Sequence, residues 1–552
     1  MGNVIFERSW IHRNNLVAKL RDVGSRVNRG ISGAATRSAA KQLYSVAKPD
    51  GLTEVSINFS SLNLLHFQVG AMSQTFANKN NFNVDARINY LLLATALLGT
   101  FFSGTATRIV SISMPTVAQS LGTDLLGVSW ALLSYQLSNI GLSVVFGRIS
   151  DIWGREKMFA LGFFIFSASS LLCGLSQTVL QLILARFVQG VGGAMLQSSS
   201  RALASESVTE DLAGRAQGYM TTAHHVGFIL GPSIGGLMID YFSWRWSFYL
   251  LVPVGLGGTV LSLVNIKRRG VTRPHHAGSI DYVGAALLFA VTSILVFIFD
   301  RRTQQIIGAA ANLFLCSLFG VCLLLFLIHE SRTASPFVQL QLFKIRRFSF
   351  SVISLLIISM CYSLTAFLLP FYLQDILRLS PTTVGILFMA PSILTVALAP
   401  LSGYLADRLG PRIPATVGVA FMIVSLAVGG LLKVDSHWLM PTLLIVIGAI
   451  TNGIFNPANS TAMISMMAKE HRGFASAMNH VTFGFGNVFG IALSGLCMSL
   501  AFEYFTGVKA AALTTENPVG FVAALNLTFV AATALTLLAL FTSALRGAER
   551  PG

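Results

Sequence analysis

Long apolar segments follow one another along this chain from about residue 88 to residue 545, and short polar connections separate them. Each segment has about 20 residues, which is the length that an α-helix needs to cross the hydrocarbon core of a bilayer. Only 11% of the 552 residues are charged, whereas soluble domains contain about 25% charged residues. The sequence therefore predicts an all-α polytopic membrane protein, because a soluble protein of this size could not be covered with so few charges.

The apolar segments predict fourteen membrane-spanning helices in three groups. We expect an N-terminal six-helix bundle at 87–266, a linker with two inserted helices at 267–347, a C-terminal six-helix bundle at 348–545 and a cytoplasmic tail at 546–552. A total of twelve spans would require two segments to be re-entrant. The expected helices lie at 88–113, 126–146, 158–176, 179–203, 215–239, 246–266, 281–299, 308–329, 348–374, 382–401, 413–432, 438–466, 474–501 and 519–545.

Basic residues outnumber acidic residues, and their positions predict the orientation of the chain. The formal net charge is +16, but the lysines and arginines fall mainly in every second connection. This alternation is typical of cytoplasmic loops and not of a nucleic-acid surface. We therefore expect an integral protein of the inner or plasma membrane with both termini in the cytoplasm. Its expected partner is the lipid bilayer and not nucleic acid.

Residues 1–86 are polar and basic and lack a long apolar segment. We expect a disordered cytoplasmic extension here, because such a composition buries too little apolar surface to fold. Three alternatives remain open: an extension upstream of a true start near Met72, an organelle transit peptide and a basic segment that lies on anionic lipid.

The connection GRISDIWGREK at 147–157 carries both glycines and charges. Gly147 and Gly154 are expected to let the chain turn tightly between two helices. Asp151 can accept hydrogen bonds from Arg155 or Arg148, or it can cap a neighbouring helix. Such a charge cluster can stabilise one state of a two-state transporter, whereas a solvated loop is the plainer interpretation.

A second copy of this pattern, GYLADRLGPR, occurs at 403–412 between two later apolar segments. A charged hinge at equivalent places in two halves is typical of an internally duplicated transporter. We therefore predict a conformational switch formed by the two copies. Its residues are Gly147, Asp151, Gly154, Arg155, Gly403, Asp407 and Arg408.

The helix expected at 179–203 carries polar residues along one face, because Arg186, Gln189 and Gln197 recur with helical spacing. An arginine this far inside a membrane helix is costly unless it faces water or a partner. This predicts that Arg186 lines a central cavity. The alternative is that its side chain snorkels toward the outer surface.

Further polar residues within the apolar segments are expected to line the same cavity or to take part in coupling. Adjacent histidines at 224 and 225 can titrate near neutral pH, although such a histidine is more often an ordinary hydrogen-bonded residue. The asparagines of the later helices can instead form helix–helix hydrogen bonds. The expected cavity residues are Arg108, Arg186, Gln189, Gln197, His224, His225, Asn452, Asn456, Asn479 and His480.

Glycines recur with a spacing of four residues in the segment GFILGPSIGG at 227–236. Small residues at this spacing allow a second helix backbone to approach closely, and Pro232 is expected to kink the helix. The segment therefore predicts a helix-packing motif. It consists of Gly227, Gly231, Pro232, Gly235 and Gly236.

With these motifs, residues 88–545 resemble the major facilitator superfamily, specifically its fourteen-spanner drug:proton antiporters. GRISDIWGREK resembles the signature between the family's second and third helices, LILARFVQG its fourth-helix signature and GFILGPSIGG its antiporter signature. WRWSFYLLVPVG at 244–255 is similar to the fourteen-spanner pattern, except that Leu251 replaces the usual asparagine. The resemblance implies the major facilitator fold, with two six-helix bundles plus two inserted helices, and multidrug efflux by alternating access.

The sequence departs from this family at one position that matters for proton coupling. Fourteen-spanner antiporters usually carry an acidic residue in the first helix, where alignment on Pro115 puts Ala106, with Arg108 two residues later. No Asp or Glu lies in the middle of any expected helix, so coupling would use His224, His225 or His480, or be absent. A cavity with arginines and no carboxylate is expected to favour anionic or zwitterionic substrates.

The sequence thus predicts a secondary active transporter, not an enzyme, that exports amphipathic organic small molecules, with protons as a further candidate partner. An uncoupled or anion-selective carrier and a non-transporting membrane sensor or scaffold remain as alternatives. No G-x-x-x-x-G-K-[ST] phosphate loop occurs, which disfavours an ATP-driven pump. His275 and His276 have no ligand spacing around them, so no metal and no cofactor is expected.

Overall fold

The computed structural model shows a protein built from α-helices. The part of the chain that it describes contains no β-strand, and Ile88 and Val208 form only an isolated β-bridge. The predicted all-α class is therefore confirmed. The extension expected at 1–86 lies outside the described residues, as does the tail after residue 546. The described residues are 88–209, 212–269, 281–333, 338–464, 467, 472–508 and 515–546.

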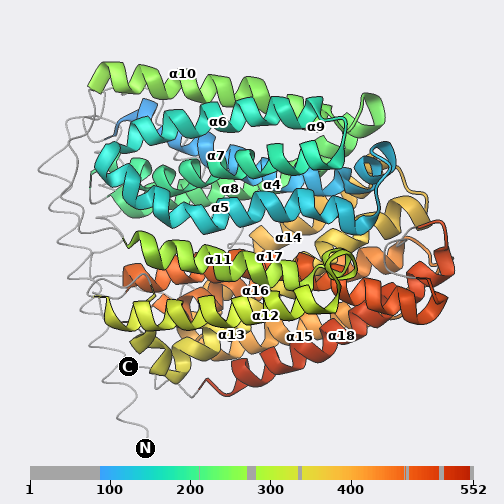
Figure 1. Ribbon diagram of the computed structural model, residues 1–552. Coiled ribbons are helices and arrows are strands. Elements are labelled where there is room, and N and C mark those ends of the chain that lie inside the picture. The colour runs from blue at the N-terminus through green and yellow to red at the C-terminus, as the bar shows by residue number, and fades with distance from the viewer. Residues whose placement is uncertain are drawn as a thin grey trace, which may run out of the picture. The chain divides into compact units, whose positions relative to one another are not determined.

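The helices fall into two halves with an insertion between them (Figure 1). The first half contains α4 (Tyr90–Ser120), α5 (Leu125–Trp153), α6 (Arg155–Leu175), α7 (Val179–Glu206), α8 (Ala213–Tyr241), the short α9 (Trp246–Tyr249) and α10 (Leu251–Arg269). The insertion contains α11 (Tyr282–Phe299), α12 (Arg301–Arg332) and the 3-10 turn η2 (Leu340–Lys344). The second half contains α13 (Arg346–Phe371), its π-helical continuation η3 (Tyr372–Ile376), α14 (Pro381–Leu409), α15 (Arg412–Gly429), α16 (Leu439–Ile464), α17 (Arg472–Thr506) and α18 (Pro518–Ala544).

Each half packs mainly on itself, and the two halves meet along two helix pairs. In the first half α4 packs on α8 and α5 on α7, and in the second half α13 packs on α17 and α15 on α16. Across the interface α5 contacts α17 and α8 contacts α14. Each of these pairs joins the second long helix of one half to the fifth of the other, which is the arrangement expected of two related repeats. The inserted helix α11 packs against α5 and α17.

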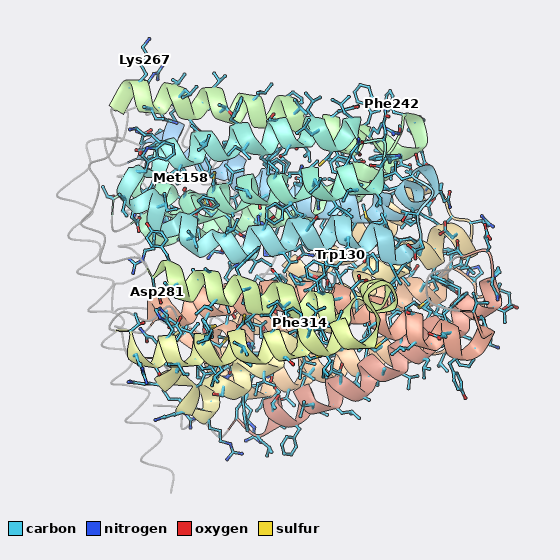
Figure 2. The ribbon with its side chains drawn as sticks, viewed as in Figure 1. Trp130, Met158, Phe242, Lys267, Asp281 and Phe314 are labelled. Carbon is cyan, nitrogen blue, oxygen red and sulfur yellow. The ribbon has the colours of Figure 1, made fainter. Side chains whose placement is uncertain are left out.

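Successive helices run in opposite directions, so the connections lie at two ends of the bundle. Met158, Lys267 and Asp281 lie near one end, and Phe242 lies near the other (Figure 2). We call the end near Lys267 the basic end and the end near Phe242 the far end. The α5–α6 and α14–α15 connections both lie at the basic end. The two copies of the predicted hinge are therefore on the same side of the molecule.

Twelve helices in the described part of the chain are long and apolar enough to cross a membrane. The helices α5 and α8 are not among them, although each has 29 residues and would extend about 44 Å. Both helices contribute polar side chains to the interior described below, which lowers their hydropathy without shortening them. A total of fourteen spans thus stays a prediction.

Some predicted helix boundaries were wrong, and one of these corrections changes the hinge. The helix expected at 126–146 continues to Trp153, so Gly147 lies inside α5 and not in a turn. Gly403 likewise lies inside α14. The turns are made by Gly154, with φ 106°, and by Gly410, with φ 78°, which only glycine adopts without strain. Hydropathy marks where a helix leaves the apolar phase, whereas its backbone hydrogen bonds continue until a residue such as glycine ends them.

The predicted packing motif in α8 lies directly against α4. A Cβ atom added to Gly227 would stand 2.2 Å from the Phe101 carbonyl oxygen, and one on Gly235 would stand 2.6 Å from the Ile109 carbonyl oxygen. A Cβ on Gly231 would approach the Thr105 carbonyl oxygen to 3.0 Å. The stripe therefore permits backbone-to-backbone packing of the two helices.

We predict that Gly227→Ala destabilises the protein, because the added methyl group meets backbone that cannot move aside. Overpacking of this kind costs about 1–3 kcal/mol, which would lower the thermal unfolding midpoint in detergent by several degrees. Gly218→Ala on the same helix is the control, since a Cβ there has no atom within 4 Å. Equal midpoints for the two variants would contradict this packing.

Candidate functional site

The two halves are joined at the far end by side-chain and backbone hydrogen bonds. Gln119 at the end of α4 donates from Nε2 to Oδ1 of Asp375 in η3 over 2.9 Å. The Thr382 amide at the start of α14 donates to Oδ2 of Asp240 in α8 over 2.8 Å. These contacts connect residues of different halves, so this end of the interface is closed.

Glycines bring the backbones of α8 and α14 into contact at the same end. A Cβ on Gly236 would stand 2.3 Å from the Pro381 carbonyl oxygen, and a Cβ on Gly385 would stand 2.4 Å from the Pro232 carbonyl oxygen. The predicted motif thus has two faces. Its stripe of three glycines packs on α4 within the first half, whereas Pro232 and Gly236 seal the first half against the second.

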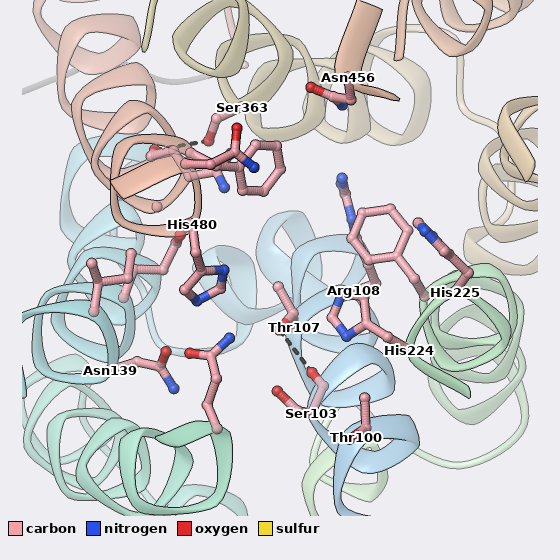
Figure 3. Close-up of a pocket in the computed structure, with 18 of the residues that line it drawn as sticks. Thr100, Ser103, Thr107, Arg108, Asn139, His224, His225, Ser363, Asn456 and His480 are labelled. Carbon is pink, nitrogen blue, oxygen red and sulfur yellow. Dashed lines mark hydrogen bonds between the residues drawn. The ribbon is translucent and has the colours of Figure 1, made fainter. Parts of the chain in front are cut away.

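A cavity of about 580 Å³ lies between the halves and extends toward the basic end. Its lining includes Gln217, Ile464 and Ser476, which lie within a few residues of helix ends at the basic end. Side chains from α4, α5, α7 and α8 face those from α13, α16 and α17 (Figure 3). We call this the central pocket. A volume of this size is typical of a small-molecule site.

The described lining of the central pocket carries positive charge and no carboxylate. Arg108 and Arg201 line it, together with His224, His225 and His480, and no Asp, Glu or Lys belongs to the described lining. Aromatic rings and amides make up much of the remaining surface. They are Tyr135, Phe228, Tyr362, Phe367, Phe483, Gln136, Gln197, Gln217, Asn139, Asn456, Asn479 and Asn487.

Arg108 on α4 stands at the interface of the two halves. Its guanidinium carbon lies 4.0 Å from the ring centre of Phe228 in the first half and 4.9 Å from that of Tyr362 in the second half. The same three residues also border a smaller cavity of about 40 Å³ in the second half. The Nε atom of Arg108 is buried without a hydrogen-bond partner, so this donor is available to a ligand.

Two buried acceptors on other walls of the central pocket are also unsatisfied. They are Oε1 of Gln197 on α7 and Oδ1 of Asn479 on α17. Buried polar atoms are normally hydrogen-bonded, and each exception in a pocket calls for a ligand or water. The residues that line the pocket therefore include one unsatisfied donor, on Arg108, and two unsatisfied acceptors, on Gln197 and Asn479.

Arg186 and Gln189 do not line the central pocket, so this part of the prediction was wrong. Arg186 is 1% exposed, its Nε donates to the Ala131 carbonyl oxygen over 3.0 Å, and an Nη1 atom donates to Oε1 of Gln189. Gln189 in turn donates to the Ser170 hydroxyl over 2.7 Å. The guanidinium carbon of Arg186 lies 4.2 Å from the ring centre of Tyr135. Arg186 is thus satisfied inside the first half, and it supports Tyr135, which does reach the pocket.

The first hinge copy forms a charge cluster at the basic end. Arg155 donates to Oδ1 of Asp151 from Nη2 over 2.8 Å and from Nε over 3.0 Å. It also forms an ion pair with Glu206 at the end of α7, a partner that sequence analysis missed because it lies 51 residues away. The cluster therefore ties α5, α6 and α7 together within the first half.

The second hinge copy is built differently. Asp407 is exposed and forms no ion pair among the described residues, and the Arg408 guanidinium stacks 4.7 Å from the ring centre of Tyr404. A Cβ atom on Gly403 would have no neighbour within 4 Å, and one on Gly147 would stand 3.8 Å from the Ser198 Cβ atom. The two copies therefore share their turn glycine but not their charge pairing.

The remaining predicted cavity residues divide between the pocket and the core. Arg108, Gln197, His224, His225, Asn456, Asn479 and His480 line the central pocket. Asn452 does not; it accepts a hydrogen bond of 2.9 Å from Nδ2 of Asn456 and lies 7% exposed. Arg201 and Tyr362 were missed. Arg201 continues the stripe of Gln197 by one helical turn, which could have identified it, whereas no local pattern distinguishes Tyr362.

No cluster of three or more metal-ligating side chains occurs among the described residues.

Comparisons with known proteins point to membrane transport. A family model described as Major Facilitator Superfamily matches residues 96–490 and 351–551. The riboflavin transporter RibZ of Clostridioides difficile is 26% identical over 409 residues, which covers 72% of this chain and 87% of RibZ. The drug efflux pump JefA of Mycobacterium tuberculosis is 29% identical over 409 residues, which covers 73% of this chain and 79% of JefA.

Among solved structures, a bacterial homolog of the human lysosomal transporter Spinster, in an inward-facing and unoccupied conformation, has the same fold. The TM-score is 0.59 at 16% identity, over 83% of this chain and 96% of that chain.

We predict that Gly236→Ala opens the far end, because its methyl group would meet the Pro381 backbone. The separation of the two halves at the far end can be measured between spin labels that replace Tyr241 and Tyr504. These residues belong to different halves and are 76% and 80% exposed. Double electron–electron resonance should show a larger population of long distances in the variant. Gly218→Ala should leave the distribution unchanged, and an unchanged distribution in Gly236→Ala would refute the seal.

Proposed function

Because the chain belongs to the Major Facilitator Superfamily, we propose that it is a secondary transporter that carries amphipathic organic anions or zwitterions by alternating access. The observation that carries this proposal is a pocket between the halves with two arginines and no carboxylate in its described lining. The curated relatives support a small-molecule substrate, since those named above carry riboflavin or drugs by name.

The pocket chemistry favours a substrate with a negative group and an aromatic or apolar body. An anion can accept a charge-assisted hydrogen bond from Nε of Arg108. The rings of Phe228, Tyr362 and Phe483 provide flat apolar surface beside it. Donors on the substrate can then pair with the open acceptors of Gln197 and Asn479. Among the described lining residues, a cation would meet only positive or neutral groups.

The arrangement of the halves fits one state of an alternating-access cycle. The interface is closed at the far end and the pocket extends toward the basic end. The positive-inside rule assigns the basic end to the cytoplasm, together with both termini. In this state the pocket is open to the cytoplasm, and efflux is the direction that the drug-pump relatives support. We further propose that α5 and α8 also cross the membrane, which gives fourteen spans and two six-helix bundles with a two-helix insertion.

The charge cluster of the first hinge is proposed to set the rate of the conformational change. Its three residues connect the ends of α5, α6 and α7 at the basic end, where the halves must approach each other when the pocket closes to the cytoplasm. The far-end contacts between α8 and α14 must separate in the same step. Substrate binding itself does not involve the cluster.

We predict that purified protein in liposomes transports naphthalene-1-sulfonate but not a naphthyl trimethylammonium ion of the same size. Naphthalene-1-sulfonamide serves as the neutral compound in this comparison. Arg108→Ala should weaken sulfonate binding about 10- to 100-fold, as expected when a charge-assisted hydrogen bond of ~1.5–3 kcal/mol is lost. Radiolabelled uptake and equilibrium binding measure the two effects.

The control is Arg346→Ala, an exposed arginine that stacks on Phe350 outside the pocket. It should leave sulfonate binding unchanged. Preference for the ammonium compound, or no transport of the sulfonate, would contradict the proposed substrate class.

We predict that Asp151→Asn lowers the turnover number and leaves the affinity for the sulfonate unchanged, because it removes a charge partner of Arg155 and neither residue belongs to the described pocket lining. The pair is partly exposed, at 25% and 27%, so the effect on rate is modest, about 2- to 5-fold for an interaction of up to ~1 kcal/mol. Asp407→Asn is the matched change in the second copy and should have a smaller effect. Equal effects of both variants would rule out a special role for the first cluster.

A further inference from the structure

Three histidines face the central pocket from both halves. His224 and His225 come from α8, with ring centres 5.9 Å apart, and His480 comes from α17. Figure 3 shows His480 on one side of the pocket and His224 and His225 on the other, with Arg108 beside the latter. The three imidazoles surround the space where the proposed substrate would lie.

The other groups that face this space keep a constant charge. Arg108 on α4 and Arg201 on α7 are the cationic neighbours, and Tyr135 on α5 and Tyr362 on α13 are the phenolic ones. The lining contributed by α16 is neutral, with Asn456, Ser460 and Ile464. Arginine and tyrosine side chains do not change charge between about pH 5 and pH 8, whereas histidine does. Histidine is therefore the residue type of the described lining whose unperturbed side chain titrates in the physiological range.

We propose that the pocket binds a proton on these histidines together with the substrate anion, so that proton and anion cross the membrane in the same direction. This inference rests on the proposed function, because it takes the substrate to be an anion. In the empty pocket, a protonated imidazole is opposed first by its burial and then by the positive charges of Arg201 and Arg108. A bound anion offsets this repulsion and favours protonation, and protonation in turn favours the anion by the same factor.

The sign of this coupling is opposite to that of a carboxylate site. At a carboxylate, a proton and a cationic substrate compete for one negative charge, so each leaves when the other binds and the two move in opposite directions. The described pocket lining holds no carboxylate. In place of this competition, binding of the proton and binding of the anion favour each other. Antiport, which the family resemblance implied, therefore does not follow from this pocket.

This coupling changes what drives efflux. A proton that leaves with the anion cannot draw energy from a proton gradient directed into the cell. Efflux then follows the concentration gradient of the substrate and is fastest when the cytoplasm is the more acidic side. The proposed cargo is thus an organic acid that accumulates inside, exported with its proton.

The first test measures binding of naphthalene-1-sulfonate to the purified protein by calorimetry between about pH 5.5 and pH 8.5, the range in which histidine titrates. The sulfonate stays ionised throughout, so any pH effect belongs to the protein. We expect the affinity to rise as the pH falls, by at most about tenfold per pH unit for one linked proton, with net proton uptake on binding. Affinity that is constant or falls with falling pH would overturn the proposal.

Variants assign the effect to the histidines. A triple variant with His224→Gln, His225→Gln and His480→Asn should bind at every pH with the weak affinity that the natural protein has at high pH. His437→Gln, an exposed histidine outside the pocket, should keep the full pH dependence. A triple variant that also keeps it would refute the assignment.

The second test separates this inference from the proposed function. Liposomes with acid outside should take up the sulfonate faster than liposomes with equal pH, and liposomes with acid inside should take it up more slowly. Transport that ignores the gradient, or responds with the opposite sign, overturns the coupling and leaves the anion carrier intact. Absence of binding and transport at every pH would overturn both.

Discussion

A charge inside the membrane must be satisfied by the protein itself, and the two buried arginines of the first half meet this constraint in different ways. Arg186 donates to the Ala131 carbonyl oxygen and to Gln189, and it stacks on Tyr135. The rings of Phe228 and Tyr362 lie beside the Arg108 guanidinium, and its Nε has no hydrogen-bond partner. Since an unsatisfied donor in such a place is costly, the first arrangement is structural and the second is suited to a ligand.

Close packing of glycines explains why the halves are joined at one end and apart at the other. The Gly236 and Gly385 contacts bring α8 and α14 backbones together at the far end. Toward the basic end the central pocket separates the side chains of the two halves. Two backbones that touch at glycines have no side chains between them, so their contact acts only over a short distance. A small tilt of one half against the other therefore breaks this contact completely. This makes the far end well suited to switch between two states rather than to loosen gradually.

Sequence patterns predicted the helices, the packing stripe and the Asp151–Arg155 pair, because each depends on residues that are near one another along the chain. Glu206 was missed because it approaches Arg155 only through the fold. Arg186 was assigned to the cavity because periodicity identifies a helix face but not what the face contacts. Gly147 was placed in a turn because hydropathy fell there, yet α5 continues for six further residues, to Trp153. The pocket as a whole needed tertiary structure, since seven helices contribute to it.

The sandwich of Arg108 between Phe228 and Tyr362 has a consequence for an unloaded carrier. The two rings belong to opposite halves, so any rocking that parts α8 from α13 strips one aromatic face from the guanidinium. Each cation–π contact of the guanidinium stabilises the protein by about 0.5–2 kcal/mol, and in the empty pocket no ligand replaces a lost contact. A bound anion would supply the missing partner of the guanidinium. In the transport cycle proposed above, the stack therefore disfavours the conformational change of the empty protein, and Arg108, the proposed contact of the substrate anion, also suppresses leakage across the bilayer.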